Sequence, residues 1–192
     1  MIHEMIIIAI ISISIALIRK RKISNLENIK IKGLGFFILS LLVQNGSIFI
    51  VSKYSETSIG MFINDYFTWI HCFSYQLILI GIALNLEKNY MKIFFIGTVM
   101  NFTVILFNGM QMPVRLPLEM KNSWENFLYL NSSKDLIHTL MDNDTRFKLL
   151  GDIIILRNPY PFTKVISLGD VALLIGFFDL IQEETLPQKK TI

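Results

Sequence analysis

The chain has 192 residues, of which 53% are hydrophobic and only 17% are charged, and its formal net charge at pH 7 is +3. Soluble domains are usually less apolar and more charged, so this composition argues against a soluble globular protein. The basic residues flank apolar segments, which argues against a nucleic-acid partner. We expect an all-α integral membrane protein that forms one membrane domain over residues 1–192.

Charged residues divide the chain into five apolar segments, most of them close to the length that a membrane-spanning helix needs. In lipid an isolated strand leaves its backbone groups unpaired, so each segment is predicted to be helical. Asp170 and Asp179 interrupt the last segment. The predicted transmembrane spans cover about residues 2–18, 33–52, 66–86, 93–112 and 165–181.

Lysines and arginines predict the orientation of these spans in the cell membrane. They follow the first span, separate the third from the fourth and follow the fifth. Because cytoplasmic loops carry the positive excess, the N-terminus is predicted outside and the C-terminus in the cytoplasm. The basic cluster at 19–22 follows the first apolar segment, which is the reverse of a cleavable signal peptide. Residues 113–164 then form an extracytoplasmic segment.

Polar and small residues recur at helical spacing in the spans and are predicted to face one another. Packing and interhelical hydrogen bonds explain such stripes, and a polar cavity or substrate path through the bundle is the alternative. No charged residue lies at the centre of the second, third or fourth span, which argues against an ion pathway. The stripes comprise Gly33, Ser40, Gln44 and Ser47, then Thr68, His71, Cys72, Tyr75 and Asn85, then Gly97, Asn101 and Asn108, and finally Gly169, Ala172 and Gly176.

The extracytoplasmic segment is predicted to be a helical cap between the fourth and fifth spans. Apolar residues from Met120 to Leu128 have the spacing of a surface helix, and Ser132 or Ser133 is suited to begin a second helix that carries His138. Glycine and proline in residues 108–114 predict a turned helix end. The eight apolar residues 149–156 are too few to span and suggest a re-entrant or buried segment.

Three titratable residues, His138, Asp152 and Asp170, are candidate catalytic residues on the cap side. A histidine and two carboxylates can serve as general acid and base, and they are also weak candidates for a metal site. Helix capping is the alternative for both aspartates, since each follows a glycine at a predicted helix start. Candidate binding residues near the turn are Asn108, Gly109, Pro113 and Arg115.

No motif in the chain indicates a bound cofactor. The single cysteine, Cys72, rules out an internal disulfide and a cysteine-based metal site. Motifs typical of zinc proteases, serine hydrolases and phosphate-binding loops are lacking.

Several short motifs resemble those of a family of small bacterial multi-pass membrane proteins that is classed only as a domain of unknown function. They are Asn-Gly-x-x-Met-Pro-Val, Leu-Gly-Asp and Ser-x-Gly-Asp, and the likeness lies mainly between residues 108 and 176. The resemblance supports the predicted topology and implies no activity. The matching residues are Asn108, Gly109, Met112, Pro113, Val114, His138, Thr145, Gly151, Asp152, Pro159, Pro161, Ser167, Gly169 and Asp170.

The sequence favours a non-enzymatic binding or accessory subunit with a polar extracytoplasmic site. Its expected partners are the lipid bilayer and a second membrane protein. The alternative is a membrane-embedded enzyme that uses His138, Asp152 and Asp170. A small transporter is the third hypothesis.

Overall fold

The computed structural model describes residues 1–116, 135–157, 160 and 164–186. Most of these residues are helical, and short strands lie near one end of the helices. The helices are α1 (Ile2–Ile18), α2 (Leu34–Tyr54), α3 (Ser58–Asp65), α4 (Phe67–Ala83), α5 (Asn89–Leu106) and α7 (Leu168–Glu184), with 3-10 turns η1 (Ile23–Asn28) and η3 (Lys148–Leu150). The strands are β1 (Met112–Val114), β2 (His138–Leu140), β3 (Ile154–Leu156) and β4 (Lys164–Ile166).

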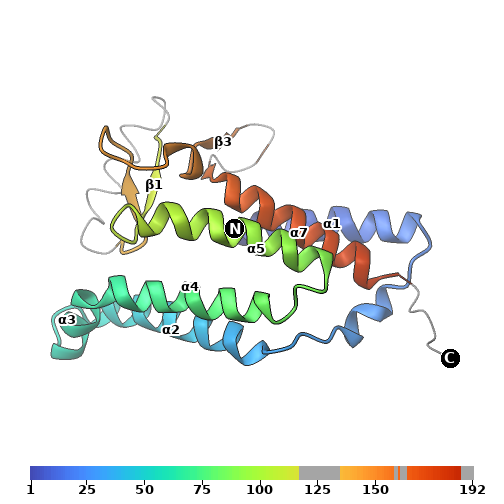
Figure 1. Cartoon of the computed structure of the whole chain (residues 1–192), viewed down its shortest axis with the longest axis horizontal. Helices are drawn as coiled ribbons and strands as arrows, with labels where there is room; N and C mark the ends of the chain where they lie inside the picture. The colour runs from blue at the N-terminus through green and yellow to red at the C-terminus, as the bar shows by residue number, and fades with distance from the viewer. Residues whose placement is uncertain (117–134, 158–159, 161–163, 187–192) are drawn as a thin grey trace.

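The long helices form two layers that run along the same axis (Figure 1). One layer contains α2 packed against α4, and the other contains α5 packed against α7, which also contacts α1. The layers join where α4 contacts α5. We call the four strands and the turns between them the cap, and the end of the bundle that carries them the cap end.

The predicted spans coincide closely with helices, and the largest difference is at the end of α5. This helix ends at Leu106 rather than near 112, because Gly109 and Met110 adopt positive φ angles of 68° and 63°. Among the described residues, α2 and α5 are long and apolar enough to cross a membrane, and α3 with α4 makes a third span if this pair, bent by 64°, is counted as one. The 17-residue α1 is apolar but shorter.

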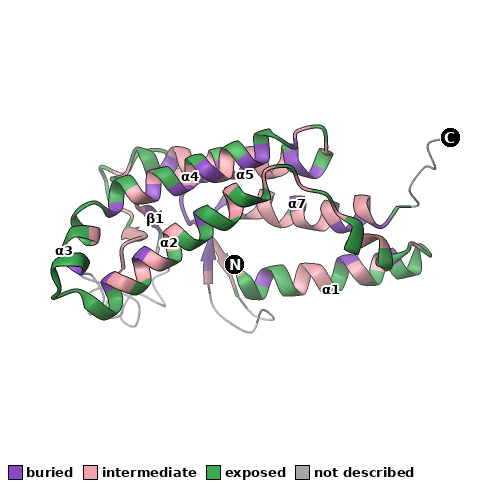
Figure 2. Ribbon diagram, turned by 90° about the horizontal axis from the view of Figure 1, so that it is seen from below, coloured by how far each residue is buried: buried purple, intermediate pink, exposed green. Residues whose placement is uncertain are grey.

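The outer faces of the helices are strongly apolar, which is compatible with a membrane location. Many large hydrophobic side chains of α1 and α2 are more than half exposed, among them Ile10, Ile18, Leu41, Leu42 and Phe49. Figure 2 shows exposed residues recurring along both helices. Soluble monomers rarely expose so much contiguous apolar surface, whereas lipid covers such a surface at no cost.

Small residues let α5 and α7 approach closely, as their stripe predicts. A Cβ atom added to Gly97 would lie 2.7 Å from the backbone oxygen of Gly169 and 3.1 Å from the Cβ of Ala172. One added to Gly176 would lie 3.0 Å from the Phe94 ring. A larger residue at Gly97 would therefore push the two helices apart.

Charged residues gather at the bundle end opposite the cap. Lys88 lies 2.7 Å from Glu184, and Lys32 lies 2.7 Å from Glu87. Arg21 donates to the side-chain oxygen of Gln182 at 3.1 Å. Arg21, Lys32 and Lys88, which are among the basic residues that predict the cytoplasmic side, thus lie at one end of the fold.

The described part of the cap contains two small sheets, and the prediction of a helical cap is wrong for these residues. Strand β1 pairs in parallel with β2, and β3 pairs with β4 in antiparallel fashion. His138 lies in β2 rather than in a helix, because this segment pairs with β1. Asp135 accepts from the amides of Ile137 and His138 in a turn at the start of the strand. Residues 149–156 form η3, a bend and β3. The predicted surface helix at 120–128 and the helix start at Ser132 or Ser133 lie outside the described residues.

Candidate functional site

Asp152 is the most deeply buried carboxyl group among the described residues of the cap, with 8% of its surface exposed. It lies beside β1 in an isolated parallel bridge with Val114. Its amide donates to the carbonyl of Pro113 at 2.9 Å, and its carbonyl accepts from the amide of Arg115 at 2.8 Å. Asp152 therefore pairs with a strand and does not cap a helix, which corrects one of the two sequence-based interpretations.

The side chain of Asp152 is not satisfied by the protein. Its Oδ1 is buried and has no hydrogen-bond partner among the described residues. Burial and, second to it, the charge of Asp170 raise the pKa of Asp152 to about 7, although His138 and Lys164 act in the opposite direction. A carboxyl group with this pKa exchanges a proton near neutral pH.

His138 is held by a carboxylate three residues earlier in the chain. Its Nδ1 lies 3.1 Å from Oδ2 and 3.2 Å from Oδ1 of Asp135. Burial lowers the pKa of His138, but the hydrogen bond and charge of Asp135, with the charges of Asp152 and Asp170, raise it above its usual value. Asp135 thus orients the ring and favours its charged form.

Asp170 takes part in capping helix α7, but as the third helical residue of a capping box rather than as the N-cap that the sequence-based alternative proposes. Ser167 is the N-cap residue, and its Oγ accepts from the amide of Asp170 at 2.9 Å in a capping box. The Oδ1 of Asp170 also accepts from Nδ2 of Asn101 at 3.0 Å. Ser167 in turn donates to Oδ1 of Asn101 at 2.8 Å. The start of α7 is therefore tied to α5 through polar side chains.

The turn after α5 has a structural role in placing the cap. The Nδ2 of Asn108 donates to the carbonyls of Val104 and Arg146, and its Oδ1 accepts from the amide of Arg146. Gly109 supplies a positive φ angle at the turn. Of the four candidate binding residues, Pro113 and Arg115 flank Asp152 in the fold, whereas Asn108 and Gly109 shape the turn.

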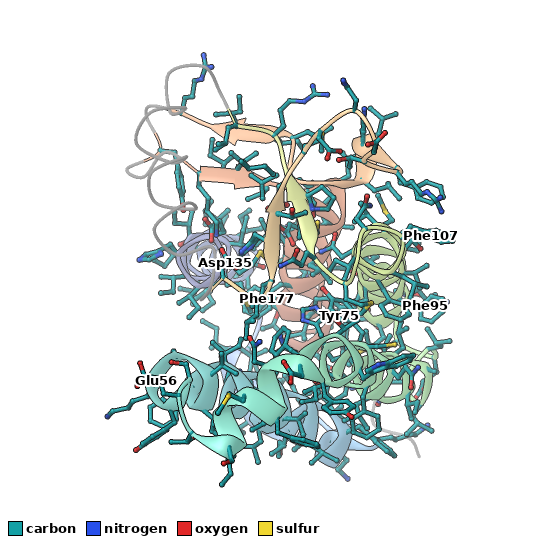
Figure 3. The ribbon with its side chains drawn as sticks, turned by 90° about the vertical axis from the view of Figure 1, so that its left-hand side faces the viewer. Glu56, Tyr75, Phe95, Phe107, Asp135 and Phe177 are labelled. Atoms are coloured by element: carbon teal, nitrogen blue, oxygen red, sulfur yellow. The ribbon has the colours of Figure 1, made fainter. Side chains whose placement is uncertain are left out.

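An aromatic and polar column connects α4 with the cap end. His71 stacks on Tyr75 with ring centroids 5.2 Å apart, and Tyr75 stacks on Phe102 of α5 at 5.3 Å. His71 is 2% exposed, and its Nδ1 lies 3.0 Å from Nε2 of Gln44. Figure 3 shows Tyr75 between the two helical layers, below the strands. The Nε2 of His71 is buried without a hydrogen-bond partner among the described residues.

The three catalytic candidates lie near one another but are not directly bonded. The charges of His138 and Asp170 both act on Asp152. Among the described residues, no hydrogen bond or ion pair joins these three side chains. Within the same residues, no three histidine, cysteine, aspartate or glutamate side chains gather closely enough to hold a metal ion. The arrangement suits proton exchange and hydrogen bonding better than metal coordination.

Asp135 belongs to the site although the sequence motifs single out only His138, Asp152 and Asp170. Its spacing from His138 was a usable signal, since an aspartate three residues before a histidine can reach the ring in a turn. Tyr75 and Asn101 stand out in the sequence only as members of polar stripes. Their positions beside the cap depend on how the helices pack.

The model of a known family matches residues 28–182, and its description reads "Family of unknown function (DUF5317)". The chain belongs to this family. The match extends well before the motifs at 108–176 that suggest the resemblance, and it covers all of α2 to α5 and most of α7. No curated protein and no solved structure matches the chain significantly.

Proposed function

We propose that this member of the DUF5317 family is a multi-pass membrane protein that binds a partner or lipid through a polar site at the cap end. The observation that carries the proposal is the buried Oδ1 of Asp152, which has no partner within the described residues. An unsatisfied buried carboxyl oxygen is costly, and a bound hydrogen-bond donor would offset this cost.

We propose a topology of five spans in which the N-terminus and the cap lie outside the cell. Helices α1 and α7 each have 17 residues, which corresponds to about 26 Å and nearly matches the hydrocarbon core. The acids Asp170 and Glu184 of α7 lie at opposite ends of the helix, each with a polar partner. The cluster of lysines and arginines opposite the cap supports a cytoplasmic location for that end.

Co-purification from native membranes in mild detergent tests the binding function. We expect the wild-type protein to retain a partner or lipid that Asp152→Ala loses and that Asp152→Asn keeps, because the amide still offers an oxygen acceptor. Asp142→Asn, in an exposed turn of the cap, is the matched control. The proposal fails if wild type and Asp152→Ala retain the same set of molecules while both remain folded.

An acid–base enzyme is the second candidate function, and the Asp135–His138 pair favours it. A carboxylate that orients a histidine beside a second acid with a pKa near 7 is suited to move protons to and from a substrate. Asp152→Asn separates the two functions. If it keeps the ligand and the fold but abolishes chemical conversion of that ligand, the protein is an enzyme.

A further inference from the structure

A cavity of about 450 Å³ lies between the two helical layers and is separate from the cap residues described above. This volume is within the range of about 300–1,000 Å³ that is typical of small-molecule sites. Its walls come from α2, α4, α5 and α7. The apolar lining residues include Leu34, Phe37, Ile78, Phe94, Leu173 and Leu180.

The lining is polar only toward one end. Its polar side chains are Tyr75, Thr98 and Asn101, and Asn101 also donates to Asp170 at the start of α7. On α5 the cavity extends from Met91 to Asn101, which corresponds to about 15 Å of helix. Half of a hydrocarbon core about 30 Å thick has the same length. The cavity is therefore a long apolar site, about one leaflet deep, with a polar end directed toward the cap.

The charge at the polar end limits the class of ligand. Asp152 and Asp170 both act electrostatically on Tyr75. Among the described residues, the cationic groups that act on Asp152 are His138, Lys164 and the N-terminal amine, and each is already paired with a carboxylate, Asp135 or Glu4. An anionic head group would meet net negative charge in a poorly hydrated place, whereas a hydroxyl can both donate to and accept from these groups without that repulsion.

We propose that the cavity binds the hydrocarbon chain of a neutral lipid, and that the lipid's hydroxyl head lies at the Tyr75–Asn101 end. The ligand class is a single-chain or isoprenoid alcohol drawn from the bilayer. Tyr75 contributes a hydroxyl that has no hydrogen bond to any described residue and is free to bond the head group. This inference rests on the proposed binding function, because the head group of the lipid would lie toward the cap end, where we propose the polar binding site.

Photo-crosslinking tests this inference. The protein is reconstituted in phosphatidylcholine vesicles, and the probe is hexadecanol that carries a diazirine in its chain. We expect the probe to label cavity-lining peptides of α4, α5 and α7. Palmitic acid with the same diazirine should label them at least about tenfold less at equal concentration, because its carboxylate is repelled. Equal or stronger capture of palmitic acid would overturn the proposal in favour of an anionic lipid.

Two tryptophan substitutions on α7 separate cavity binding from contact with bulk lipid. Leu173→Trp fills the cavity and should reduce hexadecanol labelling by about tenfold. Ile175→Trp is the matched control, since Ile175 is 53% exposed and does not line the cavity. If Leu173→Trp does not fold, Ile78→Trp fills the cavity from α4 instead. Equal labelling in the filled and control variants overturns the proposal.

Tyr75→Phe tests the position of the head group, since it removes the hydroxyl and keeps the stacked ring. It should weaken capture of hexadecanol but not of a diazirine-bearing hexadecane, and equal losses for both probes would refute the assigned head position.

Failure of this inference is distinguishable from failure of the proposed function. A partner that co-purifies with wild type and is lost in Asp152→Ala, without hexadecanol capture in the cavity, would leave only the binding function standing.

Discussion

Replacing Asp152 by asparagine should stabilise the protein at neutral and alkaline pH. In the fold, burial and the charge of Asp170 raise the pKa of Asp152 from 3.8 to about 7. The folded state therefore binds a proton more tightly than the unfolded state does. The contribution of Asp152 to the free energy of unfolding is therefore largest below pH 4, decreases as the pH rises toward 7 and is constant above that. Asparagine carries no charge at any pH and avoids this loss.

The pKa shift of Asp152 sets an upper limit for the stabilisation by Asp152→Asn. Three pKa units correspond to about 4 kcal/mol of unfolding free energy above pH 7, and structural relaxation will reduce this value. For a chain of this size each kcal/mol moves the melting midpoint by about 2–4 °C. Asp152→Asn should thus melt several degrees above wild type at pH 8 and at nearly the same temperature at pH 4.

Thermal unfolding in detergent at a series of pH values measures this difference. Asp142→Asn is a control with the opposite sign, because hydrogen bonds from Thr145 lower the pKa of Asp142. Its substitution should destabilise the protein at neutral pH and have less effect as the pH falls below 4. If Asp152→Asn melts below wild type at pH 8, and wild-type stability does not change between pH 5 and 8, the reasoning about Asp152 is refuted.

Three further predictions concern helix packing, capping and the histidine. Gly169→Ala should destabilise the protein by about 1–3 kcal/mol in thermal or denaturant unfolding, because its Cβ would collide with a side chain of α5. Gly46→Ala, with open space around it, should be neutral or stabilising by up to about 1 kcal/mol, and an equal loss at both glycines would contradict this argument. Ser167→Ala removes the N-cap of α7 and should cost about 1–2 kcal/mol in the same assay. Asp135→Asn should lower the pKa of His138 in an NMR titration, and an unchanged pKa would show that the pair does not form.

The sequence predicts features that depend on neighbouring residues. Apolar segments separated by charges locate the helices within a few residues, because hydrogen bonds inside a segment decide its conformation in lipid. The Ser167–Asp170 capping box is local in the same sense, and so is the turn at Gly109. Arg21 and Lys88 mark one end of the bundle because each lies in a connection between apolar helices.

Only the tertiary structure decides the features that depend on distant segments. Local propensity predicts a helical cap, whereas β1 finds its partner β2 more than twenty residues later in the chain. The position of Asp152 also depends on a distant segment, since its backbone forms a bridge with Val114 of β1 while its side-chain Oδ1 is buried without a partner among the described residues. The cavity at Tyr75 likewise exists only because two layers of helices meet along part of their length. Composition and spacing determine which segments are helices, but packing between remote segments determines which polar groups are left without a partner.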